Sequence, residues 1–441
     1  MKTPFELMLE WKGYPFERAS VDLEAVSALS PRARLDWQQE RKWEIARFHA
    51  ANNPAYRALI AGAVPTRWDA LPVVTKALFQ RPLSEGLSQG YRPEAVHTSS
   101  TSGSSGEPFF FARDKYTHAR TWALIAQRYG WHGLRLNSRQ ARFYGIPLEF
   151  WPRLGEMAKD RLMNRARFPV FDLSDPTLGG FRRRIARGRF DYLYGYTNSL
   201  LEFARYLLRI GAKLAAECPS LKACVVTSEM CTPADRGVLA EAFGVPIVNE
   251  YGASEIGVVA FEDPSGRWRL SSENVYVEVV DEGGRPVEDG QAGQILVTDL
   301  FNRAMPFVRY RVGDVGVLQT RPEIAGNGPE LVSLDGRIND TILLPSGRKA
   351  AGLTFYYVAR SLLAGAAAPR EFVIRQTAMD EFVFDVVSDV PLSDQNVRTI
   401  QEKMVLYLEP GLRLRINPVA AIPRLPSGKR KHFFSEIAPP R

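Results

Sequence analysis

The amino-acid sequence predicts an α/β protein. We expect a large N-terminal domain of helices and parallel-rich sheets with a β-rich subdomain, followed by a small, mobile α+β C-terminal domain. Three observations lead to this prediction: a strand–helix–strand pattern mid-chain, short strand-like segments after residue 267, and mixed strands and helix after residue 336. Alternation of strands with helices is typical of parallel sheets.

The N-terminal part of the chain, residues 1–90, is predicted to be largely helical. Apolar residues recur at helical spacing over residues 35–48. A second helix with a broad apolar face is expected over residues 196–211, where Gly211 is placed to end it.

The central strand–helix–strand unit begins with a short apolar run at residues 223–227. Thr232 then reads as an N-cap, Pro233 as the first helical residue and Asp235 as the partner in a capping box. A second strand is expected at residues 246–249. Two strands joined by a helix at this spacing favour parallel pairing.

The last third of the chain is predicted to hold many short strands. The β-rich subdomain is expected to contain strands at residues 268–270, 275–280, 294–298 and 315–318. The C-terminal domain is expected to contain strands at 341–344, 371–375 and 381–387 and a helix at 394–407. We place the boundary after Asp335, which gives domains of residues 1–335 and 336–441.

The composition excludes several classes of protein. Of the 441 residues, 45% are hydrophobic and 24% are charged, unlike disordered, collagen-like or disulfide-scaffold proteins. No apolar run approaches the ~18 residues of a membrane helix, so we expect no membrane span. The N-terminus shows no signal-peptide pattern and only three cysteines occur, so the expected location is cytoplasmic.

The net charge is mildly positive, at 57 − 49 = +8. This excess suits a protein that handles polyanionic small molecules such as nucleotides. The basic residues are scattered and form no stripe with stacking aromatics, so we expect no nucleic-acid partner.

The strongest local motif is a loop rich in hydroxyls and glycine. Its backbone can bend closely around an anion while N–H and O–H groups donate to it. A flexible surface loop is the alternative interpretation. The residues that would cradle phosphate are Thr101, Ser102, Gly103, Ser104, Ser105 and Gly106.

Four further segments favour a nucleotide site. Residues 249–255 follow a predicted strand, where α/β sheets bind ligands, and offer an amide, an aromatic face, a glycine and a carboxylate. Residues 310–314 place Asp314 in a predicted tight turn. Residues 335–340 lie at the domain boundary, and residues 426–430 carry Lys429 on a glycine turn.

In this order, the five segments resemble the adenylate-forming superfamily of acyl-CoA synthetases, luciferases and peptide-synthetase adenylation domains. The resemblance covers residues 90–435. Within the superfamily the chain looks most like the phenylacetate–CoA ligase branch, because of its length, the segment 97–100 before the loop and the segment 305–311.

The resemblance implies a set of nucleotide contacts. The loop 101–106 would wrap the β- and γ-phosphates of ATP. Tyr251 would stack on adenine beside Gly252, and Asn249 would meet the exocyclic amine. The remaining contacts would be Ser254 to phosphate, Glu255 to Mg²⁺, Asp314 to the ribose hydroxyls and Arg337 in support of Asp314.

The resemblance also implies the chemistry. Lys429 and Glu255 would be the catalytic residues, with Lys429 bridging the carboxylate and ATP during adenylation. A hinge near Asn339 and Asp340 would let the C-terminal domain move between half-reactions. Relatives usually carry an acid or lysine at the position of Asn339.

The acid pocket is implied less directly. Trp131 follows a position where relatives place an aromatic that borders the pocket, with core packing as the alternative. Tyr144 and Gly145 are further candidates. Ser228 occupies the position of a small residue that relatives have in a segment lining the adenine pocket. Ser254 occupies a position where relatives usually have threonine.

These expectations define a function with alternatives. The leading hypothesis is ATP- and Mg²⁺-dependent activation of an aryl or arylacetic acid, followed by transfer to CoA. An adenylating enzyme that hands the acyl group to a carrier-protein thiol or an amine is the second. A degenerate ligase fold that only binds nucleotide is the third. The oligomeric state is open, with a homodimer among the expectations.

Overall fold

The computed structural model resolves the chain into two compact units. The first unit takes in residues 2–100, 109–136 and 250–335, and the second takes in the described residues of 137–249 and of 341–437. The described ranges are 2–100, 109–145, 150–320, 329–335, 341–351, 354–359, 371–388, 390–422 and 433–437. The predicted domain boundary after Asp335 stays a prediction.

The first unit opens with helices, as predicted. Thr3 begins the first of them with a capping box, because its hydroxyl accepts from Glu6 N while Glu6 accepts from the Thr3 N–H. The helix expected at residues 35–48 lies within a longer one capped by Ser30. The helices are α1 (Pro4–Trp11), α2 (Phe16–Ser27), α3 (Pro31–Asn52), α4 (Pro54–Leu59), α5 (Leu83–Gly86) and α6 (Lys115–Gly130).

The strands of the first unit pair antiparallel. β1 (His97–Ser100) pairs with β2 (Phe110–Arg113). The end of β7 (Ile247–Ala253) also belongs to this unit. β7 pairs with β8 (Gly257–Glu262), and β8 pairs with β9 (Trp268–Leu270). A four-stranded sheet has the order β10 (Val275–Val280), β11 (Ala292–Asp299), β12 (Tyr310–Gln319) and β13 (Glu330–Asp335). The strands predicted for the β-rich subdomain are therefore confirmed, two of them as parts of longer strands.

One prediction in this sheet is wrong. Residues 310–314 form no separate tight turn, because they belong to β12. Gln294 pairs with Val315 and Leu296 pairs with Arg311, which leaves residues 312–314 opposite Ile295 alone. Gly313 has φ +93° in this bulge. Glycine and aspartate suit bulges as well as turns, and here the neighbouring strands hold both ends in the sheet.

The second unit contains the predicted parallel sheet. The strands β4 (Arg165–Phe168), β3 (Gln140–Phe143), β5 (Tyr192–Tyr196) and β6 (Ala223–Thr227) lie in this order and pair parallel. Helix α11 (Pro233–Phe243) starts at Thr232 with the predicted capping box and leads into β7. The other helices are α7 (Phe150–Leu162), α8 (Asp175–Gly188), α9 (Thr197–Arg209) and α10 (Leu214–Glu217).

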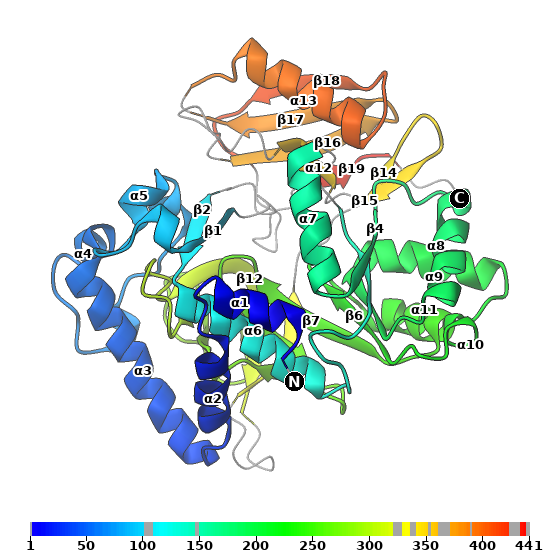
Figure 1. Cartoon of the computed structure of the whole chain (residues 1–441). Helices are drawn as coiled ribbons and strands as arrows, with labels where there is room; N and C mark the ends of the chain where they lie inside the picture. The colour runs from blue at the N-terminus through cyan, green and yellow to red at the C-terminus, as the bar shows by residue number, and fades with distance from the viewer. Residues whose placement is uncertain are drawn as a thin grey trace. The chain divides into compact units, whose positions relative to one another are not determined.

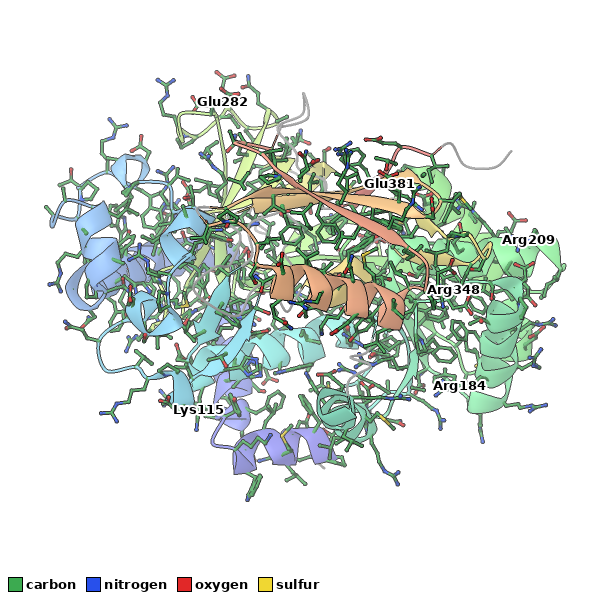
Figure 2. All side chains as sticks on the ribbon, turned by 90° about the horizontal axis from the view of Figure 1, so that it is seen from above. Lys115, Arg184, Arg209, Glu282, Arg348 and Glu381 are labelled. Carbon is green, nitrogen blue, oxygen red and sulfur yellow. The ribbon has the colours of Figure 1, made fainter. Side chains whose placement is uncertain are left out.

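The helices of this unit present apolar residues to the sheet, and most of their charged residues are exposed to solvent. Leu200, Phe203 and Leu207 of α9 are fully buried beside Phe143 of β3. Arg184 of α8 and Arg209 of α9 lie at the surface in Figure 2, and Arg209 pairs with Asp175 at 2.6 Å. Burial of the apolar face stabilises the helix more than its intrinsic propensity does.

The C-terminal segment forms an α+β arrangement, as predicted. Its sheet has the order β18 (Arg413–Pro418), β17 (Glu381–Val387), β16 (Glu371–Ala378) and β19 (Phe433–Ser435), and α13 (Asp394–Tyr407) packs on it (Figure 1). Ile400 and Met404 of α13 are buried against Phe382 and Phe384 of β17. The remaining elements are β14 (Thr341–Leu343), β15 (Lys349–Ala351) and α12 (Thr354–Ala359).

In the part of the chain that the structure describes, no helix combines the length and the apolar character needed to cross a bilayer.

Candidate active site

The segment 249–255 lies at the end of β7 and in the tight hairpin that follows. Ala253 pairs with Gly257, so that residues 254–256 form the loop. Ser254 is exposed there, whereas Glu255 is buried. A side chain at Gly252 would place Cβ 2.2 Å from the carbonyl oxygen of Gly257, so only glycine allows this close approach.

Glu255 is held by a tyrosine of β12. The hydroxyl of Tyr310 donates to Glu255 Oε1 at 2.7 Å, and both side chains are buried. The guanidinium of Arg113 interacts electrostatically with Glu255 and donates to the carbonyl of Ser254 at 2.6 Å. The hairpin is therefore fixed from both β12 and β2.

Asp314 is linked to the same segment. Its carboxylate Oδ2 accepts a hydrogen bond from the hydroxyl of Tyr251 at 3.1 Å. Asp314 is half-buried and lies in the bulge of β12, whereas the ring of Tyr251 is buried. The two predicted nucleotide residues thus lie together within the first unit.

Arg309 holds the start of β12 in place. This buried residue adopts a left-handed conformation with φ +49°. Its guanidinium donates to the carbonyl of Gly284 at 2.6 Å and to that of Leu71 at 2.5 Å, and it forms an ion pair with Glu278 at 3.3 Å. Backbone strain of this kind persists only where the surroundings over-determine it.

In the second unit, the side chains of Tyr144 and Ser228 lie next to each other. Their hydroxyl oxygens are 3.3 Å apart. The Tyr144 ring packs on Tyr196, with 4.0 Å between ring centroids, and the guanidinium of Arg142 lies 4.2 Å from the Tyr144 centroid. The buried Gly145 accepts a hydrogen bond through its carbonyl from Arg167 at 2.6 Å.

Ser228 has an unusual backbone conformation. Its φ is +70°, in the left-handed region that favours glycine. The side chain of Ser228 is exposed. The unfavourable backbone conformation is therefore confined to this one residue. The segment following β6 therefore keeps a glycine-like bend without a glycine.

The next residue, Glu229, is a half-buried acid whose Oε1 is buried and which the sequence did not single out. Its Oε2 accepts from the backbone N–H of Asn198 at 2.8 Å, while among the described residues its buried Oε1 has no hydrogen-bond partner. Burial raises the pKa of Glu229 to about 7, against the opposing effect of the Asn198 N–H. This carboxyl group ties the end of β6 to the start of α9.

Asn249 and Trp131 have different surroundings. Asn249 is a buried residue of β7.

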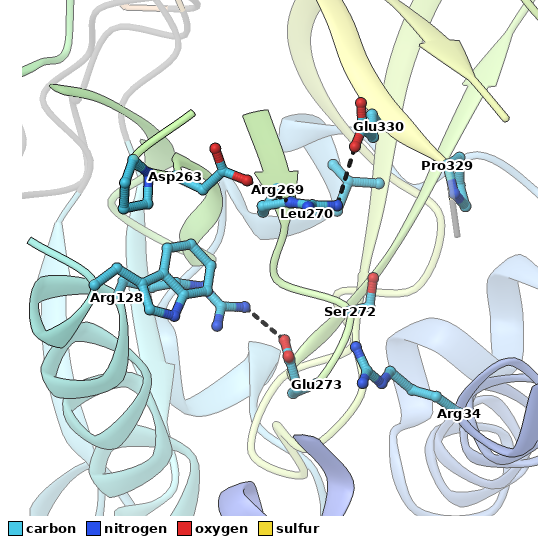
Figure 3. A pocket seen from close by; sticks show the side chains of 11 residues that line it. Arg34, Arg128, Asp263, Arg269, Leu270, Ser272, Glu273, Pro329 and Glu330 are labelled. Atoms are coloured by element: carbon cyan, nitrogen blue, oxygen red, sulfur yellow. Dashed lines mark hydrogen bonds and ion pairs between the residues drawn. The ribbon is translucent and has the colours of Figure 1, made fainter. Parts of the chain in front are cut away.

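Trp131 lines a pocket of about 410 Å³ in the first unit, with the guanidinium of Arg128 4.4 Å from its ring centroid. Figure 3 shows the ion pairs of this pocket, Arg128 with Glu273 at 2.6 Å and Arg269 with Glu330 at 3.0 Å. These pairs neutralise four of the charges that line the pocket, and Arg34 and Asp263 line it as well.

Several predicted residues lie outside the described ranges. They are Thr101, Ser102, Gly103, Ser104, Ser105, Gly106, Arg337, Asn339, Asp340 and Lys429.

The donor set at Glu255 fits Mg²⁺ that arrives with a nucleotide. Within the described ranges, no group of three or more His, Cys, Asp or Glu side chains is placed to hold a metal ion. Glu255 offers one buried carboxylate whose Oε1 is held by Tyr310. Mg²⁺ is usually bound by one or two carboxylates together with substrate phosphates and water.

The sequence interpretation missed Tyr310 and Arg113 as parts of the site. Tyr310 lies in the segment 310–314, in which only Asp314 carries a predicted role, and Arg113 follows the hydroxyl-rich loop. Each contacts the hairpin through a partner far away in sequence, so no local signal reveals it.

Known proteins resemble this chain in sequence. The family model described as AMP-binding enzyme matches residues 173–300. The phenylacetate-coenzyme A ligase of Thermus thermophilus is 26% identical over 336 residues, which cover 71% of this chain and 73% of that protein. The enzyme of the same name from Escherichia coli is 30% identical over 131 residues, which cover 28% of this chain and 29% of that protein.

The fold also has a solved counterpart. A crystal structure of 2-hydroxyisobutyryl-CoA ligase covers 92% of this chain with a TM-score of 0.57 and 17% sequence identity, and the match covers 90% of that chain. At this identity the likeness shows the fold. Over the matched residues the chain is similar to AMP-binding enzymes, among them phenylacetate-CoA ligases, and this similarity agrees with the resemblance to the adenylate-forming superfamily.

Proposed function

We propose that the chain activates a carboxylic acid with ATP and Mg²⁺ and transfers the acyl group to CoA. In the first half-reaction the carboxylate oxygen attacks the α-phosphorus and pyrophosphate leaves. In the second, the thiolate of CoA attacks the acyl carbonyl and AMP leaves. A carboxylate is a poor electrophile, and the adenylate provides the leaving group that it lacks.

The observation that supports this proposal most is the double link between the 251–255 segment and β12. Tyr251 is bound to Asp314 and Tyr310 to Glu255. One link joins an aromatic face to an acid suited to ribose hydroxyls. The other holds an acid suited to a hard cation. Such an arrangement suits a nucleotide with bound Mg²⁺.

The remaining nucleotide contacts belong to the proposal. Tyr251 would stack on adenine next to Gly252, and Asn249 would meet the exocyclic amine of adenine. The loop 101–106 and Ser254 would donate to the phosphates. Arg337 would assist Asp314 at the ribose.

The charges of the reaction centre need cations. Mg²⁺ bound by Glu255 would neutralise phosphate charge. The ammonium of Lys429 would offset the repulsion between the incoming carboxylate and the α-phosphate. A hinge at Asn339 and Asp340 would then carry Lys429 away from the site before the thiol arrives.

The acid is proposed to be an aryl or arylacetic acid. The supporting feature is the aromatic cluster of Tyr144, Tyr194 and Tyr196, which lies beside Ser228 and Gly145 in the second unit. Flat aromatic faces favour a flat aromatic substrate. The expected role of Trp131 in the acid pocket stays a prediction.

The acceptor has two alternatives. A carrier-protein thiol or an amine would use the same first half-reaction and the same residues. A chain that only binds nucleotide would keep Tyr251 and Asp314 but would gain nothing from Lys429.

The experiment that tests the proposal is an acid panel with ATP and Mg²⁺. Benzoate, phenylacetate and straight-chain acids are compared, and pyrophosphate release is measured with and without CoA. We expect release that depends on the acid, and an aryl thioester when CoA is present. Release without any thioester would favour the carrier or amine acceptor, and no release with any acid would contradict the enzymatic proposal.

A further inference from the structure

Tyr310 is a buried residue whose ring cannot easily change position. It is the first residue of β12, and its side chain is fully buried. Its ring packs edge-on against Phe307 and Phe79, with centroid separations of 5.1 and 5.8 Å. A ring clamped in this way keeps its hydroxyl at one place.

The backbone at Tyr310 is equally restrained. The N–H of Val74 donates to the carbonyl of Arg309 at 3.1 Å, and the N–H of Arg311 donates to the carbonyl of Val74 at 2.9 Å. These two hydrogen bonds flank Tyr310. The guanidinium of Arg309 adds its contacts to Leu71 and Gly284.

The hydroxyl of Tyr310 reaches only one of the two oxygens of Glu255. It donates to Oε1 at 2.7 Å. Among the described residues, Oε2 accepts no side-chain hydrogen bond, and the nearby cation Arg113 directs its Nη2 to the carbonyl of Ser254. A carboxylate with one oxygen held and the other open has a preset orientation toward a ligand.

We infer that Tyr310 is a positioning residue that orients Glu255 so that its second oxygen faces Mg²⁺ on the nucleotide. This inference rests on the proposed function, since it takes Glu255 as the metal contact. Tyr310 itself touches neither metal nor nucleotide. Its hydroxyl restricts the Glu255 side chain to one rotamer, so the carboxylate need not be ordered when the cation arrives.

The test measures nucleotide binding, which needs no turnover. The affinity of the full-length protein for ATP is determined by calorimetry in Mg²⁺ and, separately, in EDTA. Tyr310→Phe should weaken binding about tenfold in Mg²⁺, as expected for loss of the partner of a metal ligand. Binding in EDTA should be unchanged, because the mutation leaves the adenine and ribose contacts in place.

The matched control is Tyr56→Phe. Tyr56 is as buried as Tyr310 in the same core, and among the described residues its hydroxyl has no hydrogen-bond partner. This mutation removes a buried hydroxyl that does not contact Glu255, and so measures the effect of losing a buried hydroxyl alone. We expect no change in either condition.

The outcomes separate the two proposals. Equal binding by Tyr310→Phe and the parent protein in Mg²⁺, or equal weakening in Mg²⁺ and EDTA, would overturn the positioning role. A parent protein that binds ATP no better in Mg²⁺ than in EDTA would overturn the metal assignment of Glu255 as well. ATP binding by the parent protein in neither condition would contradict the proposed function itself.

A double mutant keeps the inference testable if Tyr310→Phe is poorly stable. Glu255→Gln removes the charge that Tyr310 is inferred to orient. If Tyr310 acts through Glu255, adding Tyr310→Phe to Glu255→Gln should weaken Mg²⁺-dependent binding no further. Additive losses in Mg²⁺ would mean that Tyr310 acts on the fold in general and would overturn the inference.

Discussion

Tyr251 and Asp314 are joined by a hydrogen bond of 3.1 Å from the tyrosine hydroxyl to carboxylate Oδ2, across 63 positions of sequence. The bond connects the end of β7 to the bulge of β12. If Tyr251 also stacks on adenine, as proposed, its ring and its hydroxyl have separate roles, and mutation can distinguish them.

Tyr251→Phe should keep the stacking face and lose the brace. We expect the KM for ATP to rise up to about tenfold, the size of one hydrogen bond to a charged group, with little change in kcat. Steady-state kinetics with varied ATP measures this. Tyr251→Ala removes the ring as well and should raise KM further. If Ala is no worse than Phe, the ring does not stack on adenine.

Lys429→Ala should impair the first half-reaction selectively. Loss of one preorganised cation is expected to reduce acyl-adenylate formation by about 10²–10³-fold. The second half-reaction, measured with pre-made acyl-adenylate and CoA, should keep most of its rate, because the proposed hinge has moved Lys429 away by then. Lys431→Ala, a neighbouring basic residue, is the control and should affect neither. Near-normal adenylation by Lys429→Ala would exclude the proposed role of Lys429.

Arg309→Ala should destabilise the fold strongly. Its removal leaves Glu278 charged and buried, which typically costs about 3–5 kcal/mol, and frees the carbonyls of Leu71 and Gly284. The free energy of unfolding in urea measures the effect. Arg285→Ala breaks the exposed pair with Asp281 and should cost at most about 1 kcal/mol. Similar losses in the two variants would contradict the structural role of Arg309.

Glu229→Gln should change the pH dependence of stability. The folded pKa of Glu229 is raised to about 7, above its ordinary value of 4.5. Between these values the folded protein holds a proton that the unfolded chain has released, so this group's contribution to stability falls as pH rises through that window. Gln does not titrate. The unfolding free energy of Glu229→Gln, relative to the parent, should therefore increase from pH 5 to pH 8.

The control for Glu229 is the exposed Glu282, whose mutation to Gln should leave the pH profile parallel to that of the parent. A constant difference between Glu229→Gln and the parent across the whole range would show that Glu229 is already ionised at pH 5.

Much of the fold is predictable because its signals are local. The start of α11 follows from Thr232, Pro233 and Asp235, which meet within one helical turn. The strand β17 and the helix α13 have the predicted bounds, since their apolar periodicity needs no partner to be recognised. The short strands β3 and β4 contain arginines and few apolar residues, so their sequences do not indicate strands. They are strands because they pair with neighbouring strands of the sheet.

The site divides in the same way. The sequence by itself determined the motifs, their order and the residue types that suit a nucleotide, because glycine, hydroxyl and carboxylate chemistry is readable at each position. Only the tertiary structure decided that Asp314 lies in a bulge of β12, that Tyr251 braces it, and that Tyr310 holds Glu255 from 55 positions away. Those contacts depend on strand register and on side-chain packing between distant segments, and neither leaves a local pattern in the chain.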